Sequence, residues 1–323
     1  MNPQKNPPHY KPTAGTGSPL VLLVPPECAG LRLDQALARL LPEFSRSRLQ
    51  QWVRGGHVSV DGRRVNAKTK LWGGESVNVS PQADVLTRAC AAEDIPFPVV
   101  YEDEAIIVVD KPAGLVVHPG SGNWSGTLLN ALLHHAPQLA ALPRAGIVHR
   151  LDKDTSGLLV VAKTLTAQTD LVRQLQARTV GREYFALVHG SVARSGSVEA
   201  PIGRHPLQRT RMAIVGKGKP ATTRFEPLEH GPGWSLLRCR LETGRTHQIR
   251  VHLSSIGHPL IGDPAYRSHR AFSAHLAAAG HFPRQALHAA RLILVHPLTG
   301  HLMQWESPMP ADMRELLSRL RRD

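Results

Sequence analysis

The sequence predicts an α+β protein with two folded parts, and three observations lead to that prediction. The chain has 323 residues, which is enough for about two domains of ordinary size. Residues 31–82 combine two helical patterns with alternating apolar runs, which indicates a small helix-helix-hairpin unit. The residues after 97 mix short β-branched runs with helical periodicity. We therefore expect a small N-terminal α/β unit and a larger α+β domain.

The first residues are predicted to be a disordered tail. Residues 1–19 contain five prolines and two glycines and almost no apolar side chains. Such a segment cannot bury enough apolar surface to offset the entropy that it loses on ordering. The small unit is therefore expected at residues 20–82.

Two helices are expected early in the small unit. Leucines recur at helical spacing between residues 31 and 41, and Pro42 ends this pattern. A second helix is expected to begin near Ser47, because Ser47 and Gln50 have the spacing of a capping box. Gly55 and Gly56 stand where a left-handed helix terminus is expected.

A hairpin is expected after the helices. Val58 and Val60 alternate with polar residues, and Asp61-Gly62 is a strong type I′ turn signal. A further alternating run passes through Val77 and Val79. These runs predict short strands with one buried face.

The larger domain, residues 97–323, is expected after a linker at 83–96 where apolar periodicity is weak. Its apolar runs are either short enough for strands or spaced as in helices. Strands are expected at 106–109, 158–161, 184–188 and 234–241, and helices at 166–176 and 309–320. Residues 268–286 show no clear pattern and are expected to be irregular.

The composition is strongly basic. Lysine plus arginine is 39 against 25 aspartate plus glutamate, which gives a formal net charge of +14. The surplus is concentrated in residues 31–82, with nine basic against four acidic residues, and in 201–252, with ten against three. Such a surplus predicts a polyanionic partner, although a run of charge can also be only a solvated face.

Several classes of protein are disfavoured. Cys28, Cys90 and Cys239 form no CxxC pair, which argues against a zinc ribbon and a disulfide framework and favours a reducing, cytosolic setting. No apolar run is long enough for a signal-peptide core or a membrane span. No dinucleotide-binding, P-loop, GxSxG or HExxH motif is present.

Two stretches concentrate groups that can do chemistry. Residues 149–157 read HRLDKDTSG and precede an apolar run, so two carboxylates lie among cations beside a predicted buried strand. Residues 244–252, GRTHQIRVH, supply cations that no core requires. On composition alone, the first stretch is also typical of a turn whose Asp, Ser and Gly residues cap backbone groups.

These two stretches, HRLDKDTSG and GRTHQIRVHL, resemble signature motifs of the RluA family of pseudouridine synthases. Three further matches follow the family's order, at Lys111-Pro112-Ala113-Gly114, at residues 182–190 and at Gly262-Asp263. The resemblance covers about residues 97–310 and implies a mixed, largely antiparallel β-sheet with flanking helices. Residues 31–82 resemble an S4-type RNA-binding domain, which precedes the catalytic domain in several family members.

The resemblance implies an enzyme that isomerises uridine to pseudouridine in RNA with no cofactor and no metal. Asp152 matches the essential aspartate, acting as a nucleophile at C1′ or, in a glycal route, assisting removal of the 2′ proton. Arg250 would pair with Asp152, and Tyr184 would stack near the uracil and serve as the base of the glycal route. A carboxylate, a cation and an aromatic ring are the groups that this chemistry needs. By residue type alone, Arg250 could instead clamp a phosphate and Tyr184 could be a packed strand residue.

The resemblance also implies which residues contact RNA. A uridine in folded RNA must leave the stack to reach a carboxylate. Arg150 matches the side chain that the family inserts where the base was. The remaining expected contacts are His149, Arg245, His247 and Arg209 in the larger domain, with Arg46 and Arg48 in the S4-like unit.

Residues 204–212 and 218–220 resemble the family members that modify large-subunit ribosomal RNA. This implies that a monomer acts in the cytoplasm on 23S ribosomal RNA or its precursor particle, at the stem-loop called helix 69. Other ribosomal or transfer RNA sites remain open, as does a non-catalytic RNA-binding factor of ribosome assembly. A metal-dependent nuclease built on His247, His252 and Asp263 is a third reading, against which their spacing counts.

Overall fold

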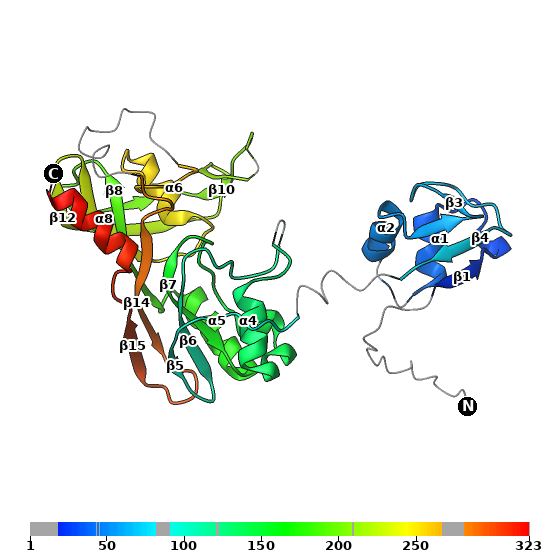
Figure 1. Cartoon of the computed structure of the whole chain (residues 1–323), viewed down its shortest axis with the longest axis horizontal. Coiled ribbons are helices and arrows are strands. Elements are labelled where there is room, and N and C mark those ends of the chain that lie inside the picture. Colours follow the sequence, from blue (N-terminus) through cyan, green and yellow to red (C-terminus); the bar gives the residue numbers. More distant parts are fainter. Residues whose placement is uncertain are drawn as a thin grey trace. The chain divides into compact units, whose positions relative to one another are not determined.

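The computed structural model describes residues 19–42, 44, 46–81, 91–120, 123–208, 210–266 and 281–322 (Figure 1). The chain divides into two compact units, residues 1–88 and 89–323, called here the N-terminal and the C-terminal unit. The expected tail, apart from residue 19, and residues 82–90 at the expected linker lie outside the described residues.

The N-terminal unit is a four-stranded antiparallel sheet with helices on one face. Along β1 and β4, more buried residues alternate with less buried ones, so one face packs against the helices. The strands are β1 (Leu20–Leu23), β2 (Val58–Val60), β3 (Arg63–Arg64) and β4 (Ser76–Val79), in the order β1-β4-β2-β3. The helices are η1 (Pro26–Cys28), α1 (Leu33–Leu40) and α2 (Arg46–Arg54). The helix-helix-hairpin prediction is confirmed.

The turn and the helix ends of this unit can be compared with those predicted from the sequence. Asp61 and Gly62 both have positive φ, as a type I′ turn requires, and Gly56 ends α2 with φ of 75°. The predicted capping box is wrong, because α2 begins at Arg46 and therefore includes Ser47. The Gln50 amide donates instead to a carboxylate on α1, that of Asp34.

The C-terminal unit is built on a nine-stranded sheet in the order β5-β6-β7-β14-β8-β13-β12-β9, with β15 also paired to β14. Only β7 and β14 run parallel among the described pairs, so the expected mixed, largely antiparallel sheet is confirmed. Its strands are β5 (Val99–Glu102), β6 (Ile106–Lys111), β7 (Ser156–Ala162), β8 (Gly181–His189), β9 (Gly196–Glu199), β12 (Thr222–Gly231), β13 (Trp234–Leu241), β14 (Leu287–Val295) and β15 (Leu302–Glu306). A separate hairpin joins β10 (Ile202–Arg204) and β11 (Met212–Ile214).

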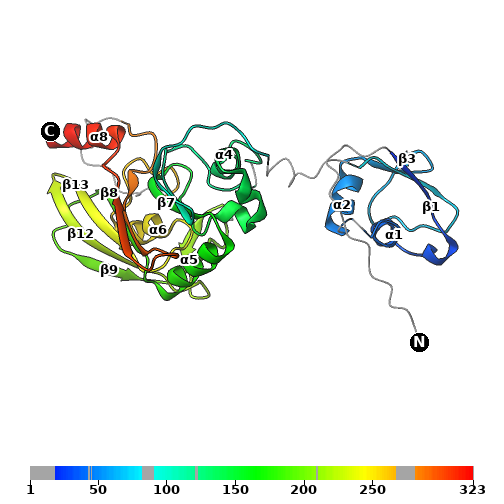
Figure 2. The same ribbon diagram turned by 90° about the horizontal axis from the view of Figure 1, so that it is seen from below.

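Helices cover this sheet, and α5 runs alongside β7 (Figures 1 and 2). Along β7, Leu159 and Val161 join the cluster that contains α4 and α6, whereas Leu158 and Val160 join the cluster that contains α5. The helices are α4 (Leu128–His135), η2 (Pro137–Ala141), η3 (Pro143–Gly146), α5 (Leu165–Ala177), α6 (Gln248–Ser255) and α8 (Ala311–Arg322). Because β7 is buried on both faces, it gives the loop before it a fixed base.

All six expected elements of the larger domain are present, at β6, β7, β8, β13, α5 and α8. Most of the expected irregular segment, residues 267–280, lies outside the described residues. No described helix is both long and apolar enough to cross a bilayer.

Candidate active site

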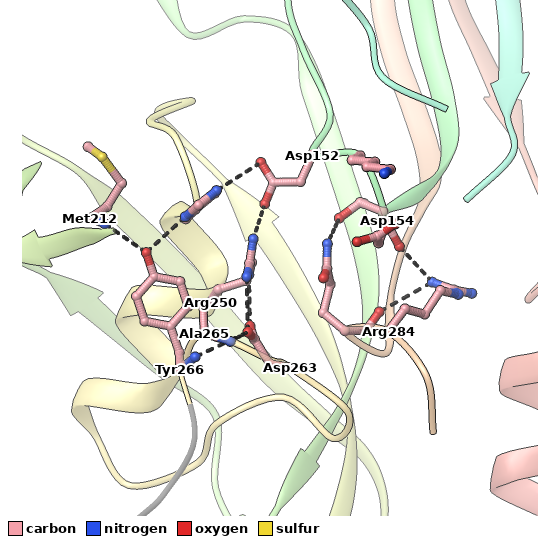
Figure 3. Close-up of polar contacts among 12 residues, drawn as sticks. Asp152, Asp154, Met212, Arg250, Asp263, Ala265, Tyr266 and Arg284 are labelled. Atoms are coloured by element: carbon pink, nitrogen blue, oxygen red, sulfur yellow. Dashed lines mark hydrogen bonds and ion pairs between the residues drawn. The ribbon is translucent and has the colours of Figure 1, made fainter. Parts of the chain in front are cut away.

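Asp152 and Arg250 meet although 98 residues separate them. Asp152 lies in the loop before β7, and Arg250 lies in the first turn of α6. Arg250 Nη1 donates to Asp152 Oδ2 at 3.0 Å, as Figure 3 shows. The arginine side chain is 7% exposed and the aspartate side chain 15% exposed, so the carboxylate is the partner nearer to solvent.

A second carboxylate, that of Asp263, binds Arg250 through the nitrogens Nε and Nη2. Asp263 accepts from Arg250 Nε at 2.7 Å and from Nη2 at 2.9 Å, and it also accepts the backbone N–H groups of Ala265 and Tyr266 (Figure 3). These donors hold the pKa of Asp263 below its usual value although burial alone would raise it. A bidentate pair fixes the plane of the guanidinium, so the group that Asp152 faces has one orientation.

His247 borders the other oxygen of Asp152. Its Nε2 lies 4.0 Å from Asp152 Oδ1, beyond hydrogen-bond distance, and its Nδ1 lies 2.8 Å from the Tyr266 hydroxyl. Tyr266 in turn accepts the N–H of Met212 from β11 (Figure 3). Burial lowers the pKa of His247 despite the nearby Asp152, which favours a neutral ring at neutral pH.

Lys111 anchors the loop that carries Asp152. Its side chain is fully buried, and Nζ donates to the carbonyls of Pro112, Leu115 and Lys153 at 2.8 to 2.9 Å. Burial lowers the pKa of Lys111 to about 7, while the charges of Asp154 and Asp152 raise it. Three acceptors match the three donors of an ammonium group.

The far side of the same loop is held by residues just before β14. Arg284 Nη1 donates to the Asp154 carbonyl at 3.1 Å, and Gln285 Nε2 donates to Thr155 Oγ1 at 3.2 Å (Figure 3). Arg284 itself is fixed by a bidentate pair with Asp312 of α8. The loop is therefore bonded on both sides, and Asp152 stands on a rigid support.

Tyr184 lies on β8 and is almost fully buried in the main apolar cluster. Burial raises its pKa, the charge of Arg182 opposes this rise, and the charge of Asp152 adds to it. Asp152 and Arg250 thus form a pair of a partly exposed carboxylate and a fixed cation.

Known proteins show the same sequence pattern. A family model described as RNA pseudouridylate synthase matches residues 105–255, and an S4 domain model matches residues 31–77. The chain is 59% identical over 300 residues to the ribosomal large subunit pseudouridine synthase D of Nitrosomonas europaea, with 93% of this chain and 87% of that protein covered. It is 52% identical over 305 residues to the protein of the same name from Pseudomonas aeruginosa, which covers 93% and 95% of the two chains. The chain belongs to the RNA pseudouridine synthase family.

A solved structure agrees with this synthase assignment. The human RNA pseudouridylate synthase domain containing 4 has a TM-score of 0.56 and 25% identity, over 69% of this chain and 93% of that one. The expected family and fold class are therefore confirmed, and the chain is an RNA pseudouridine synthase, an isomerase.

The expected RNA contacts in the synthase's C-terminal unit differ in their environment. Arg150 is exposed, two residues before Asp152. His149 is directed inward, where its Nε2 accepts the N–H of Val160, and burial lowers its pKa to about 3. Arg245 is half-buried and donates from Nε to the Pro220 carbonyl at 3.2 Å. Arg209 lies outside the described residues.

In the N-terminal unit of the synthase, Arg46 is bound to Asp34, with Nη2 to Oδ2 at 2.7 Å. Arg48 lies in α2, but its side chain is outside the description. Asp34 also accepts from Arg32 and Gln50, and its side chain is fully buried. The sequence did not indicate that Asp34 would bind these three side chains. There it was only one of the four acidic residues counted in residues 31–82.

Part of the basic stretch at 201–252 is neutralised within the sheet. Arg224 pairs with Glu242, Arg240 with Glu183, and Arg238 lies between Glu183 and Glu226. This part of the charge surplus is therefore a set of ion pairs across strands.

The histidines that the sequence left as candidate ligands have other partners. His247 lies within hydrogen-bond distance of the Tyr266 hydroxyl, and His252 lies within that distance of Thr223 Oγ1 and the Ala200 carbonyl. Among the described residues, no group of three His, Cys, Asp or Glu side chains could hold a metal ion. Lys111 and Asp263 belong to matched motifs, but their contacts with the Asp152 loop and with Arg250 were not expected.

Proposed function

We propose that the synthase converts uridine to pseudouridine in large-subunit ribosomal RNA, with Asp152 as the essential carboxylate. The observation that carries the proposal is the series Asp263, Arg250 and Asp152, in which a buried pair presents the outermost carboxylate in one orientation. The named relatives support the class of RNA. The stem-loop helix 69 of 23S ribosomal RNA, free or in its precursor particle, is the proposed site.

The reaction breaks the bond between N1 and C1′, joins C5 to C1′, and finally removes the proton from C5. Arg250 occupies Oδ2 of Asp152, so Oδ1 is the oxygen that we assign to the sugar. In one route Oδ1 bonds to C1′ as the uracil leaves, and C5 later displaces it. In the other route the uracil leaves first and Oδ1 takes the 2′ proton, which returns when C5 bonds to C1′. Both routes use the same oxygen and need no redox partner.

Tyr184 provides the aromatic wall against the uracil. Its raised pKa favours the neutral phenol at neutral pH, which suits stacking better than proton abstraction. In the glycal route this leaves Asp152 as the group that takes the 2′ proton.

RNA contacts complete the proposal. Arg150 fills the space that the flipped uridine leaves, because a planar guanidinium can stack there. Residues 20–82 dock the RNA, 83–96 are a linker, and 97–323 carry the chemistry of a cytoplasmic monomer without a cofactor. The proposed further contacts are His149, Arg245, His247 and Arg209 near the site, and Arg46 and Arg48 in the N-terminal unit.

The test follows tritium release from uridine labelled at C5 in a transcribed helix 69 RNA, in the presence of EDTA. Asp152→Asn keeps the shape of the side chain but removes the charge, and we expect the rate to fall by about 10⁴-fold or more. RNA affinity should stay within a few-fold. Asp154→Asn is the matched control, because it removes a carboxylate two residues away while the Asp154 carbonyl that Arg284 holds is kept.

Each alternative has its own outcome. Substantial turnover by Asp152→Asn contradicts the role of Asp152. Release from transfer RNA alone keeps the enzyme and removes the ribosomal substrate. Binding without release from either RNA supports the non-catalytic assembly factor.

A further inference from the structure

Tyr266 contacts both residues that border the Asp152 carboxylate. Its ring lies against the Arg250 guanidinium, with Cζ 5.0 Å from the ring centre, and edge-on to the ring of His247. Its hydroxyl lies 2.8 Å from the Met212 nitrogen and 2.8 Å from His247 Nδ1 (Figure 3). The reaction proposed above gives Tyr266 no role, although its contacts reach the centre of the site.

The hydrogen bonds of the Tyr266 hydroxyl determine the tautomer of His247. A phenol oxygen has one proton to donate and lone pairs that accept. The N–H of Met212 donates to this oxygen, and among the described residues the only acceptor within reach of the phenol proton is His247 Nδ1. Tyr266 therefore donates to Nδ1, and the neutral ring of His247 carries its proton on Nε2.

The Nε2–H group of His247 lies beside the oxygen of Asp152 that Arg250 does not bond. Nε2 is 4.0 Å from Asp152 Oδ1, and the two side chains are 22% and 15% exposed. Within the described structure, neither of these two atoms has a hydrogen-bond partner. A donor and an acceptor are therefore too far apart to bond each other but close enough for one atom to bond both.

The chemistry of these two atoms selects a hydroxyl group as their ligand. A group that bonds both must accept from the Nε2–H of His247 and donate to the carboxylate of Asp152. A hydroxyl does both through one oxygen, whereas a uracil carbonyl or a phosphate oxygen only accepts. In the proposed reaction Oδ1 acts at C1′ or takes the proton from C2′, and the ribose hydroxyl nearest to both carbons is the 2′ hydroxyl.

We propose that His247 Nε2 and Asp152 Oδ1 together bind the 2′ hydroxyl of the target ribose, and that Tyr266 is the positioning residue that fixes the His247 tautomer. The inference rests on the proposed function and names the group that His247 recognises. The 2′ hydroxyl distinguishes RNA from DNA, so this contact makes the enzyme prefer a ribose at the target position. It also holds C1′ beside Oδ1 before the reaction.

The experiment compares two synthetic helix 69 RNAs that differ at the uridine from which the wild type releases tritium. One RNA carries uridine there and the other 2′-deoxyuridine, each labelled at C5. The full-length wild type is compared with His247→Asn and His247→Gln. The asparagine amide reaches the position of Nδ1 but not that of Nε2, and asparagine tolerates the φ of 56° at residue 247. The glutamine amide reaches the position of Nε2 and donates there.

His247→Asn should lower kcat/KM about tenfold on the uridine RNA but less than about twofold on the 2′-deoxyuridine RNA, because only the first has the hydroxyl that Nε2 bonds. The ratio of the two values is the measured preference. A loss of folded protein lowers both values equally, and an effect of the deoxy sugar on the chemistry is common to all variants, so neither alters this comparison. His247→Gln should restore most of the preference.

Tyr266→Phe tests the positioning role. It keeps the ring against Arg250 but removes the hydroxyl, so the proton of His247 is no longer held on Nε2. The preference for uridine should fall by about threefold. Tyr101→Phe is the matched control, because the Tyr101 hydroxyl donates to Asp103 beside β5 and makes no contact with the Asp152 loop in the described structure. Its preference should equal that of the wild type.

Equal losses of kcat/KM on the two RNAs in His247→Asn would overturn the inference, since His247 would then act on the uracil or on the RNA backbone. A wild-type preference in Tyr266→Phe would overturn the role of Tyr266. If the 2′-deoxyuridine RNA is not turned over, its inhibition constant replaces kcat/KM; equal constants for the wild type and His247→Asn support the inference, and a tenfold rise overturns it. The proposed function fails separately, through absence of tritium release by the wild type from the uridine RNA.

Discussion

Each unit of the synthase contains an ion pair between an aspartate and an arginine. The more buried partner is the aspartate in one unit and the arginine in the other. In the N-terminal unit, Asp34 is fully buried, while its partners Arg46 and Arg32 are 49% and 37% exposed. In the C-terminal unit, Arg250 is the buried partner, and Asp152 is the group nearer to solvent. The same pair of residue types therefore presents a cation in one unit and a carboxylate in the other.

On the proposed function, this difference separates a pair that serves RNA binding from a pair that serves the reaction. Arg32, Arg46 and Gln50 together occupy both oxygens of Asp34, so it cannot act on a substrate but can fix arginines that face solvent. Arg250 bonds one oxygen of Asp152, and His247 is too distant to bond the other. On the proposed function, the buried partner is therefore the aspartate in the pair that serves affinity and the arginine in the pair that serves chemistry.

After the loss of the Asp152 charge itself, the largest effect is expected where the Asp152–Arg250 pair loses its support. Asp263→Asn removes one charge of the bidentate clamp and lets Arg250 turn away from Asp152. A small misplacement of this kind lowers kcat by about 10²-fold, while the KM for RNA stays near that of the wild type. Single-turnover tritium release separates the two quantities.

Glu229→Gln is the control for this prediction. Glu229 also forms a bidentate pair, with Arg321 of α8, but the pair is more exposed and makes no contact with Asp152 in the described structure. Its kcat should equal that of the wild type. If Asp263→Asn also retains full kcat, the orientation of Arg250 is not what sets the reactivity of Asp152.

A smaller effect, of another kind, is expected in the binding pair. Asp34→Asn removes the charge that holds Arg32 and Arg46, and it should destabilise the N-terminal unit by about 2 kcal/mol, less than for a fully buried pair. Hydrogen exchange of α1 and α2 measures this loss. RNA affinity should fall, while the rate on bound RNA stays unchanged; a fall in that rate would show that the units do not divide binding from chemistry.

The local sequence pattern was enough to predict the strands that consist mainly of apolar residues. The strands β7 and β13 could both be predicted from residue type, although the first four residues of β13 are all buried and do not alternate. β14 is central in the sheet but was missed, because His288 and Arg291 interrupt its apolar run. α6 was noticed only as a run of cations, since its buried Arg250 and His252 hide the apolar face that identifies a helix.

The site could be predicted in its residue types but not in its contacts. Motif resemblance selected Asp152, Arg250 and Tyr184, and the structure pairs Asp152 with Arg250. It did not assign Asp263 to Arg250 or Lys111 to the Asp152 loop, because those contacts depend on where distant segments meet. Nor did it show that His149 points inward, since its hydrogen bond to Val160 arises only when β7 forms.

The smallest expected effect concerns pH, and it again differs between the units. Burial lowers the pKa of His149 to about 3 and those of His118 and His189 to about 4, so these rings are neutral when folded. The unfolded chain takes up more protons below its histidine pKa of about 6.5, and the stability that neutral rings provide is therefore lost as pH falls from there toward 4. In the N-terminal unit, the lowered pKa of Asp34 acts only below about pH 4.

Moving from pH 7 to 5.5 should therefore cost the C-terminal unit about 1 kcal/mol through His149, with further losses from His118 and His189, whose folded pKa values also lie below this range. The Asp34 pair of the N-terminal unit should contribute no loss in this range. Hydrogen exchange of β7 and β2, corrected for intrinsic rates, measures the two units in one sample. His149→Gln keeps an acceptor for the Val160 N–H but cannot titrate, so it should reduce the change in β7 by about 1 kcal/mol. An equal change in β7 for this variant would mean that the acid sensitivity of the sheet arises elsewhere than at His149.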